Sequence, residues 1–396
     1  MQNNEMFNRL KVVELASVLA GPSVGQFFAE LGAEVIKIEN LKAGGDVTRT
    51  WKSAKEDNTD VSAYFSSVNW GKKSLAVDLS KDEGKVIVRQ LCEKADIVIA
   101  SYKPGDAEKL GVDYRTLSSY NPTLIYGQIT GYGDSERVGY DAVIQAESGF
   151  MDLNGEKDRD PLKMPVALID VLAAHHLKEG LLIALLNKQF SGKGKLVEVS
   201  LIQAAIASLV NQASNYLVAN VLPKRQGSMH PNIAPYGENY VTKSGQRVLL
   251  AIGSDRQFHQ LCRVLKLDHL ILDARFASNP QRVKNRVELN HYLGDAISKL
   301  DARIFIDQCH TLKIPAGIIQ NLQEVFEMPA AIEILIKKDS SVGVRNHISK
   351  QNGELSNVSH ILPPPKFGEH TSQILSEKLS FSALEVDSLR RKGIIQ

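Results

Sequence analysis

The chain has 396 residues, of which 43% are hydrophobic and 23% are charged, and this composition is that of a folded globular protein rather than a disordered or fibrous one. At roughly 100 to 200 residues per domain, the length predicts two domains and excludes a disulfide mini-scaffold. The 47 Lys and Arg against 45 Asp and Glu give a net charge of +2, so no overall field favours nucleic acid or an anionic membrane.

The first third of the chain alternates between strand and helix patterns. A strand at residues 11–15 precedes a helix from about 20 to 31 and a strand at 35–38. The pattern then repeats, with strands at 74–79, 96–100 and 124–129 and a helix at 82–95. Such alternation predicts a parallel sheet covered on both faces, with ligand chemistry at the carboxyl ends of its strands.

The pattern changes at Asp170, where a long helix begins and runs to about residue 191. A short strand at 197–200 and a helix at 201–219 follow, and then a β-hairpin at 237–252 that turns at Lys243-Ser-Gly. Helices continue to about Leu322, residues 346–365 form a Pro-rich surface connection, and helices at 371–379 and 382–392 close the chain. We therefore predict an α/β protein with a Rossmann-like, doubly wound large domain of residues 1–222, completed by about 323–396, and a smaller α+β domain of residues 223–322.

Cysteine usage and the N-terminus suggest a compartment. Cys92, Cys262 and Cys309 are far apart and match neither a disulfide framework nor a zinc motif, which favours a reducing environment. The first ten residues lack a signal-peptide pattern, and no stretch approaches 18 apolar residues. We expect a cytoplasmic enzyme without a metal.

Asp170 is the most informative single residue. It follows the apolar run 165–169 and directly precedes the long helix, where the helix dipole and free N–H groups favour a carboxylate anion. The alternative interpretation is a helix N-cap, a position at which Asp is common. His175 and His176 are adjacent on the helix and point to different sides, so they form no metal pair.

Other candidates are weaker. Lys72, Lys73, Lys103 and Lys109 form either a basic rim for phosphates or an ordinary charged face, and Tyr132 and Tyr140 lie in Gly-rich loops. The first strand–helix–strand unit lacks G-x-G-x-x-G, which disfavours NAD. The chain also lacks G-x-S-x-G, P-loop and H-E-x-x-H motifs, which disfavours a serine hydrolase, a nucleotide triphosphatase and a zinc protease.

Taken together, the motifs resemble the class III CoA-transferase family, also called the CaiB/BaiF family, which includes formyl-CoA transferase, carnitine CoA-transferase and α-methylacyl-CoA racemase. The resemblance runs almost end to end. Its signatures are LASVLAGP from Leu15, GAEVIKIE from Gly32, GDVTR from Gly45, NWGKKS from Asn69, YKPG from Tyr102, GYG from Gly131, GYDAVIQAESG from Gly139, SGKG from Ser191 and HPNIAPY from His230.

The resemblance implies a covalent mechanism at Asp170, which matches the family's nucleophilic aspartate. Its carboxylate would pass through a mixed anhydride and an aspartyl-CoA thioester, with neither ATP nor a metal. CoA is then a substrate moiety rather than a permanently bound cofactor. The CoA contacts of formyl-CoA transferase fall here on Val18, Leu19, Ala20, Val77, Ser101, Tyr102, Lys103, Lys109 and Tyr132.

Some positions depart from the formyl-CoA transferase pattern. Leu19 replaces a glutamine, Asn40 an arginine and Thr130 a lysine, and the segment His230–Gly237 stands where that enzyme has four glycines. Oxalate and formyl-CoA are therefore not the expected substrates. A donor such as succinyl-CoA and a small organic acid as acceptor fit the family better.

Two alternatives remain open. The racemase branch shares the fold and the aspartate but has Gly-His-Asp where this chain has Gly139-Tyr140-Asp141, and tyrosine is a poorer proton-abstracting base than histidine. A non-catalytic acyl-CoA-binding protein would not need Asp170. The resemblance also implies an open-ring subunit in an interlocked homodimer, with acyl-CoA and small carboxylic acids as its other partners.

Overall fold

The computed structural model describes residues 7–57 and 59–396. Its centre is a six-stranded sheet with the strand order β3-β2-β1-β4-β5-β6, in which every neighbouring pair is parallel. The strands are β1 (Lys11–Leu15), β2 (Glu34–Asn40), β3 (Lys72–Val77), β4 (Ile97–Ala100), β5 (Ile125–Thr130) and β6 (Leu196–Ser200). The predicted parallel α/β sheet is confirmed, and the order reverses between β1 and β4, where sheets of this kind bind ligands.

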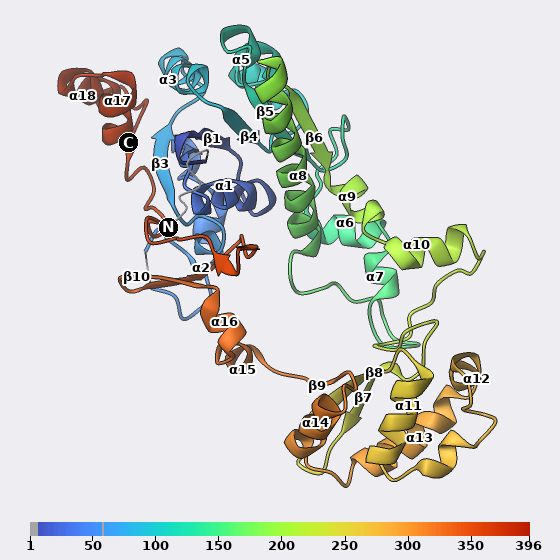
Figure 1. Cartoon of the computed structure of the whole chain (residues 1–396). Helices are drawn as coiled ribbons and strands as arrows, with labels where there is room; N and C mark the ends of the chain where they lie inside the picture. The colour runs from blue at the N-terminus through green and yellow to red at the C-terminus, as the bar shows by residue number, and fades with distance from the viewer. Residues whose placement is uncertain (1–6, 58) are drawn as a thin grey trace. The chain divides into compact units, whose positions relative to one another are not determined.

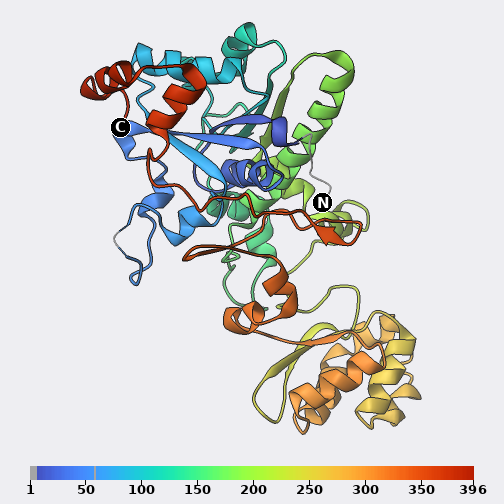
Figure 2. The same ribbon diagram turned by 60° about the vertical axis from the view of Figure 1, so that its left-hand side comes forward.

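Helices cover both faces of this sheet (Figures 1 and 2). On one face, α1 (Ala20–Glu30) and α8 (Leu168–Ser191) contact each other and the strands. On the other face, apolar side chains of α3 (Asp82–Glu93), α5 (Tyr114–Tyr120), α17 (Thr371–Leu379) and α18 (Ala383–Arg391) form one buried core with those of the strands. Burial on both faces explains why strands such as β4 are continuously apolar.

The end of the chain completes the sheet edge at β3. The backbone N–H of His370 donates to the carbonyl of Ser74 at 3.0 Å, and the Ala76 N–H donates to the Thr371 hydroxyl at 3.1 Å. The predicted closing helices are therefore confirmed as α17 and α18, and they belong to the same compact body as the first strand.

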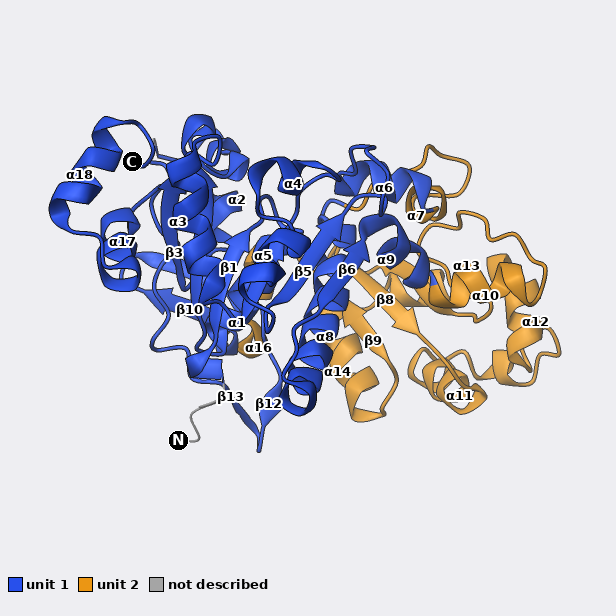
Figure 3. Cartoon of the chain, turned by 90° about the horizontal axis from the view of Figure 1, so that it is seen from above, with its two compact units in different colours: residues 1–148, 165–209, 333–396 blue, residues 149–164, 210–332 orange. Residues whose placement is uncertain are grey.

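The chain divides into two compact units (Figure 3). Unit 1 contains residues 1–148, 165–209 and 333–396, and unit 2 contains residues 149–164 and 210–332. Besides the elements above, unit 1 includes α2 (Ala63–Ser66), α4 (Asp106–Leu110), α6 (Asp141–Glu147), α9 (Leu201–Ala207) and the hairpin strands β10 (Leu335–Lys338), β11 (Ser341–Val344), β12 (Lys350–Gln351) and β13 (Glu354–Leu355). The expected small domain, residues 223–322, lies within unit 2.

Unit 2 has its own apolar core, built on a three-stranded antiparallel sheet. Its elements are α7 (Phe150–Leu153), α10 (Val210–Leu217), β7 (Tyr236–Val241), β8 (Arg247–Ala251), α11 (Asp255–Val264), α12 (Asn279–Lys284), α13 (Arg286–Ile297), α14 (Ala302–Thr311), β9 (Ala316–Ile318) and α15 (Leu322–Phe326), with α16 (Pro329–Glu333) at its end. The predicted hairpin is confirmed as β7 and β8. The third strand, β9, was not predicted, because three residues within a helical region carry no periodic signal.

One predicted helix is divided. Residues 201–219 form α9 and α10, because Val210 takes a positive φ of 40°, a value that no α-helix accommodates. The break falls at the boundary between the two units. The sequence pattern predicted a single helix because the apolar periodicity continues from one helix into the next.

Candidate active site

A cavity of about 180 Å³ lies in unit 1 at the carboxyl ends of β1, β4 and β5. The loops that follow these strands supply most of its wall, and the first turn of α8 supplies Asp170. The lining residues are Ser17, Val18, Leu19, Ala20, Gly21, Ser101, Tyr102, Lys103, Pro104, Ile129, Thr130, Gly131, Ser135, Arg137, Val138, Gly139, Tyr140, Asp170 and Leu201. This is the edge of a parallel sheet at which the sequence predicted ligand chemistry.

Asp170 is the third residue of α8, and Ala167 occupies the N-cap position. The interpretation of Asp170 as an N-cap is therefore wrong. The cap is supplied from outside the helix by Asp141, whose Oδ1 accepts a hydrogen bond from the Ile169 N–H at 2.8 Å. Gln145 donates to the other oxygen of Asp141 at 2.7 Å. The carboxylate of Asp170 is thereby left to face the cavity.

Asp170 is only 7% exposed, and this burial raises the pKa of its carboxyl to about 7, with the nearby charge of Asp141 adding to the effect. The start of a helix favours an ionised carboxylate, as the position of Asp170 predicts, but burial opposes that ionisation here. Removal from water disfavours the charged form, and a second carboxylate disfavours it further. A perturbed carboxyl in a cavity is a typical feature of an active site.

Six of the nine predicted CoA contacts line the cavity with Asp170: Val18, Leu19, Ala20, Ser101, Tyr102 and Lys103. The loop after β1 and the loop after β4 are joined by a hydrogen bond from the Ser17 N–H to the Ser101 hydroxyl at 3.2 Å. Burial raises the pKa of Tyr102 to about 12, so its phenol stays neutral.

The other three predicted contacts lie outside the cavity wall. Val77 is fully buried at the end of β3, where it pairs with Ile395. Lys109 is exposed and forms an ion pair with Asp106 at 3.0 Å. The Tyr132 hydroxyl donates to Glu147 at 2.8 Å. Their contact with CoA stays a prediction.

Lys72 and Lys73 do not form a basic rim for phosphates. Both lie at the amino end of β3, away from the carboxyl edge of the sheet. Lys72 is fully buried and pairs with Glu14 at 2.7 Å, and Lys73 pairs with Glu34 at 2.9 Å. The sequence could not separate these two lysines from Lys103 because all of them lie near strand ends.

Three residues in or next to the cavity wall were not identified as site residues from the sequence. Arg137 lines the cavity and forms an ion pair with Glu147, Asp141 caps the helix of Asp170, and Asp46 contacts the loop after β1. No motif signals Arg137, because it lies in an irregular loop. Asp46 and Asp141 are both within the resemblance motifs, but only their contacts reveal what they do.

The positions that depart from formyl-CoA transferase have local roles here. Leu19 is the N-cap residue of α1, the Asn40 side chain accepts from the Lys42 N–H at 3.0 Å, and the Thr130 hydroxyl accepts from the Gly133 N–H at 3.0 Å. The segment His230–Gly237 belongs to unit 2.

Two negative findings apply to residues 7–57 and 59–396. No group of three or more His, Cys, Asp or Glu side chains in this part of the chain is arranged to hold a metal ion. Within the same residues, no helix has both the length and the apolar character needed to cross a membrane.

Comparison with known proteins places this chain in a family. The model of CoA-transferase family III matches residues 8–371. The succinate–glutarate CoA-transferase of Agrobacterium fabrum is 38% identical in an alignment 384 positions long, which covers 93% of this chain and 94% of that protein. The human succinyl-CoA:glutarate CoA-transferase is 32% identical, and the match covers 100% of this chain and 91% of the human protein.

The fold comparison agrees. The crystal structure of a CaiB/BaiF family protein from Brucella suis matches with a TM-score of 0.81 and 37% identity, covering 94% of this chain and 99% of the other. The resemblance inferred from the motifs is therefore confirmed: the chain belongs to CoA-transferase family III, the CaiB/BaiF family, and is a CoA-transferase.

Proposed function

We propose that this enzyme transfers CoA from succinyl-CoA to a second dicarboxylic acid such as glutarate, with Asp170 as the covalent nucleophile and CoA as a substrate moiety. The main observation that supports this proposal is the buried carboxyl of Asp170, which lies in a cavity built from the loops predicted to bind CoA. The choice of acids rests on relatives named for succinate or succinyl-CoA with glutarate, mesaconate and D-citramalate.

The proposed reaction has four balanced steps. An oxygen of Asp170 attacks the thioester carbon of succinyl-CoA, giving a mixed anhydride and the CoA thiolate. The thiolate attacks the aspartyl carbon of that anhydride, releasing succinate and leaving an aspartyl-CoA thioester. The acceptor carboxylate then attacks this thioester, giving a second anhydride and the thiolate. The thiolate finally takes the acceptor acyl group and regenerates the Asp170 carboxylate.

The environment of Asp170 suits such chemistry. Because its carboxyl is almost fully removed from water, the ionised form is poorly solvated and therefore reactive. The same exclusion of water protects an anhydride from hydrolysis. One thioester replaces another, so the transfer is close to energy-neutral and needs no nucleotide.

The proposed preference for dicarboxylic acids rests on charge. While one carboxylate of the acceptor reacts at Asp170, the other needs a cation, and Arg137 and Lys103 both line the cavity. Lys103 falls in the loop predicted to hold CoA. We therefore assign the distal carboxylate to Arg137, whose partly exposed ion pair with Glu147 is weak enough to be exchanged.

The test is a matched panel of acceptors with succinyl-CoA as donor. Glutarate, mesaconate, citramalate and oxalate are compared with butyrate and valerate, and the acyl-CoA products are identified by mass spectrometry. We expect transfer to the dicarboxylates other than oxalate. If no acid receives CoA from succinyl-CoA, the proposed function is wrong.

A parallel assay in heavy water addresses proton chemistry. With Tyr140 at the cavity wall, we expect no catalytic deuterium incorporation at the α-carbon of a 2-methylacyl-CoA. Rapid, Asp170-dependent exchange without CoA transfer would assign the enzyme to racemisation instead.

We further propose that the enzyme is a homodimer, interlocked as the family resemblance implies. Apolar side chains on the second half of α8 are exposed, including Ile183 at 60% and Phe190 at 89%. In unit 2, Leu217 and Val218 are 76% and 84% exposed. Soluble monomers rarely leave such large apolar side chains clustered on one element in water, which supports a partner subunit that covers them.

A further inference from the structure

Val18, in the cavity wall, has a backbone conformation that valine rarely adopts. Its φ is 72°, in the left-handed region where a β-branched side chain crowds its own backbone. Strained residues of this kind persist only when their surroundings hold them, and they concentrate at functional sites. Val18 lines the same cavity as Asp170, two residues before α1.

The contact that holds Val18 comes from Asp46. Both carboxylate oxygens of Asp46 lie 3.3 Å from the Val18 nitrogen and accept its N–H. Asp46 is itself fixed, because its Oδ1 accepts from the Thr48 N–H at 3.0 Å and its own N–H donates to Glu39 at 2.9 Å. Only 4% of Asp46 is exposed, and its side chain is not part of the cavity wall.

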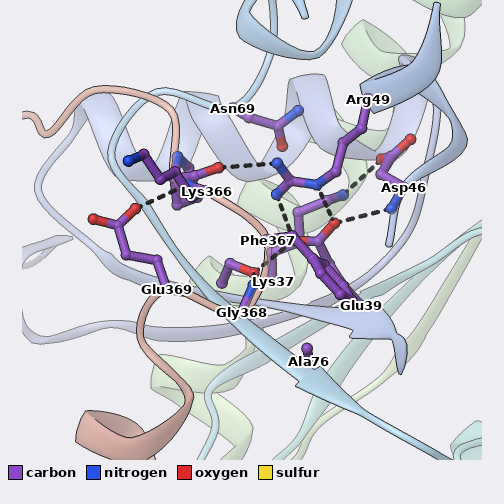
Figure 4. A network of polar contacts seen from close by, with 12 residues as sticks. Lys37, Glu39, Asp46, Arg49, Asn69, Ala76, Lys366, Phe367, Gly368 and Glu369 are labelled. Atoms are coloured by element: carbon purple, nitrogen blue, oxygen red, sulfur yellow. Dashed lines mark hydrogen bonds and ion pairs between the residues drawn. The ribbon is translucent and has the colours of Figure 1, made fainter. Parts of the chain in front are cut away.

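Lys37 joins Asp46 to the other side of the same turn. Its Nζ lies 2.9 Å from Asp46 Oδ2 and donates to the carbonyl of Ala16 at 2.8 Å. Figure 4 shows Lys37 and Asp46 beside the Glu39–Arg49 pair. The Lys37–Asp46 pair therefore hydrogen-bonds to the backbone on both sides of Ser17: Lys37 to the Ala16 carbonyl and Asp46 to the Val18 N–H.

Both members of the pair are charged. Burial acts to lower the pKa of Lys37, but the carboxylates of Glu14 and Asp46 outweigh it and raise that pKa. Burial acts to raise the pKa of Asp46, but Lys37 and the Thr48 N–H hold it below its ordinary value. Lys37 also pairs with Glu14 at 2.9 Å, so it keeps a buried carboxylate partner when Asp46 is replaced. Without Lys37, by contrast, the Asp46 carboxylate would lose its ion-pair partner while buried, which is costly.

The turn also has little room to relax. A Cβ on Gly21 would lie 2.4 Å from the Cβ of Ala16, so the start of α1 packs directly against the end of β1. The segment from Ser17 to Gly21 therefore runs between two closely spaced points, Ala16 and Gly21.

We propose that Asp46 is a positioning residue of the acyl-CoA site: its carboxylate, fixed by Lys37, holds Val18 in the left-handed conformation that aligns residues 17–21 along the cavity. The proposal rests on the proposed function of this cavity. Asp46 does not line the cavity, so it acts through the Val18 backbone.

The test combines Asp46→Asn, Val18→Gly and the double variant. Asp46→Asn keeps an oxygen for Thr48 but places an amide against Lys37 and the Val18 N–H. Glycine adopts positive φ without strain, so Val18→Gly should not need the carboxylate. The readout is the dissociation constant of free CoA by titration calorimetry, which involves no covalent step, together with kcat and the KM for succinyl-CoA.

We expect Asp46→Asn to weaken the binding of free CoA about tenfold, a typical consequence of releasing a strained backbone residue, and to raise the KM for succinyl-CoA more than it lowers kcat. In the Val18→Gly background the same change should weaken binding less than about threefold. An equal loss in both backgrounds, or no loss in either, would overturn the proposal. So would a double variant that fails to fold, because Asp46 would then serve the fold independently of Val18.

Asp113→Asn is the matched control. Asp113 also caps a helix of unit 1, accepting from the Thr116 N–H at 2.9 Å, and lies outside the cavity wall. Its replacement should lower thermal stability without changing CoA binding. If the wild type binds CoA but transfers it to no acid, the proposed function fails while the binding comparison still decides the role of Asp46.

Discussion

Asp141 and Asp170 are coupled through the backbone of Ile169. Asp141 accepts the Ile169 N–H at 2.8 Å, which fixes the first turn of α8, and its charge adds to the burial that raises the pKa of Asp170 to about 7. One carboxylate thus orients the second and also opposes its ionisation. The proposed nucleophile is therefore only partly ionised at neutral pH, but its ionised form is poorly solvated and for that reason reactive.

Asp170→Asn should fold and lose at least about a thousandfold in turnover, because an amide cannot replace the attacking carboxylate. Incubation of the wild type with succinyl-CoA and then hydroxylamine or borohydride should modify the peptide that carries Asp170. The variant should show no such modification. Near-normal transfer by Asp170→Asn would refute the covalent mechanism.

The rate should depend on pH through Asp170. Because only the ionised carboxylate attacks, kcat/KM should fall about tenfold per pH unit below an apparent pKa near 7. Asp141→Asn removes the neighbouring charge and should move this midpoint to lower pH. The pH profiles of both enzymes measure the shift. A midpoint that moves upward in Asp141→Asn would contradict the assigned coupling.

Stability should have the opposite dependence on pH. Since the pKa of Asp170 is about 7 in the folded state against an ordinary 3.8, the folded state binds more protons between these values, and stability falls as pH rises through them. Asp170→Asn should not lose stability in this way, because an amide does not ionise. At pH 8 it should be more stable than the wild type by up to about 4 kcal/mol, the equivalent of roughly three pKa units. Urea unfolding at pH 5 and pH 8 tests the difference, which should be smaller at pH 5.

Arg137→Gln should discriminate between classes of acceptor. Loss of a charged hydrogen bond to the distal carboxylate should raise KM for glutarate about 10- to 100-fold and leave monocarboxylate acceptors and CoA binding unchanged. Arg115→Gln, at an exposed position of α5, is the control. An equal loss for both acid classes would place Arg137 at CoA instead.

Dilution should reveal no folded monomer. Interlocked subunits cannot separate without at least partial unfolding, so mass photometry at nanomolar concentration should show dimers only. Two differently tagged preparations should not exchange subunits under native conditions. Exchange within minutes would exclude interlocking and leave a side-by-side dimer, and a monomer at micromolar concentration would exclude both.

Much of the secondary structure of unit 1 could be predicted from local sequence patterns. Apolar runs flanked by helix-start and helix-end residues predicted β1, α1, β2, α3 and β4 to within a few residues, because burial on both faces of a parallel sheet requires continuous apolar strands. The long α8 and the closing α17 and α18 followed from helical periodicity. Asp170 stood out for the same local reason, since it lies where an apolar run gives way to a long helix.

The electrostatics of the site required the tertiary structure. The ionisation of Asp170 depends on its 7% exposure and on Asp141, a residue 29 positions away in the chain, and no local pattern encodes either. Lys72 and Lys103 look alike in sequence, yet one is buried against Glu14 and the other lines the cavity. The left-handed turn at Val18 depends on Asp46 and Lys37, which reach it from other segments. The sequence by itself determined which segments form strands and helices and marked Asp170, because those properties follow from neighbouring residues. Burial, charge pairing and backbone strain arise from contacts between distant segments, so only the tertiary structure decided them.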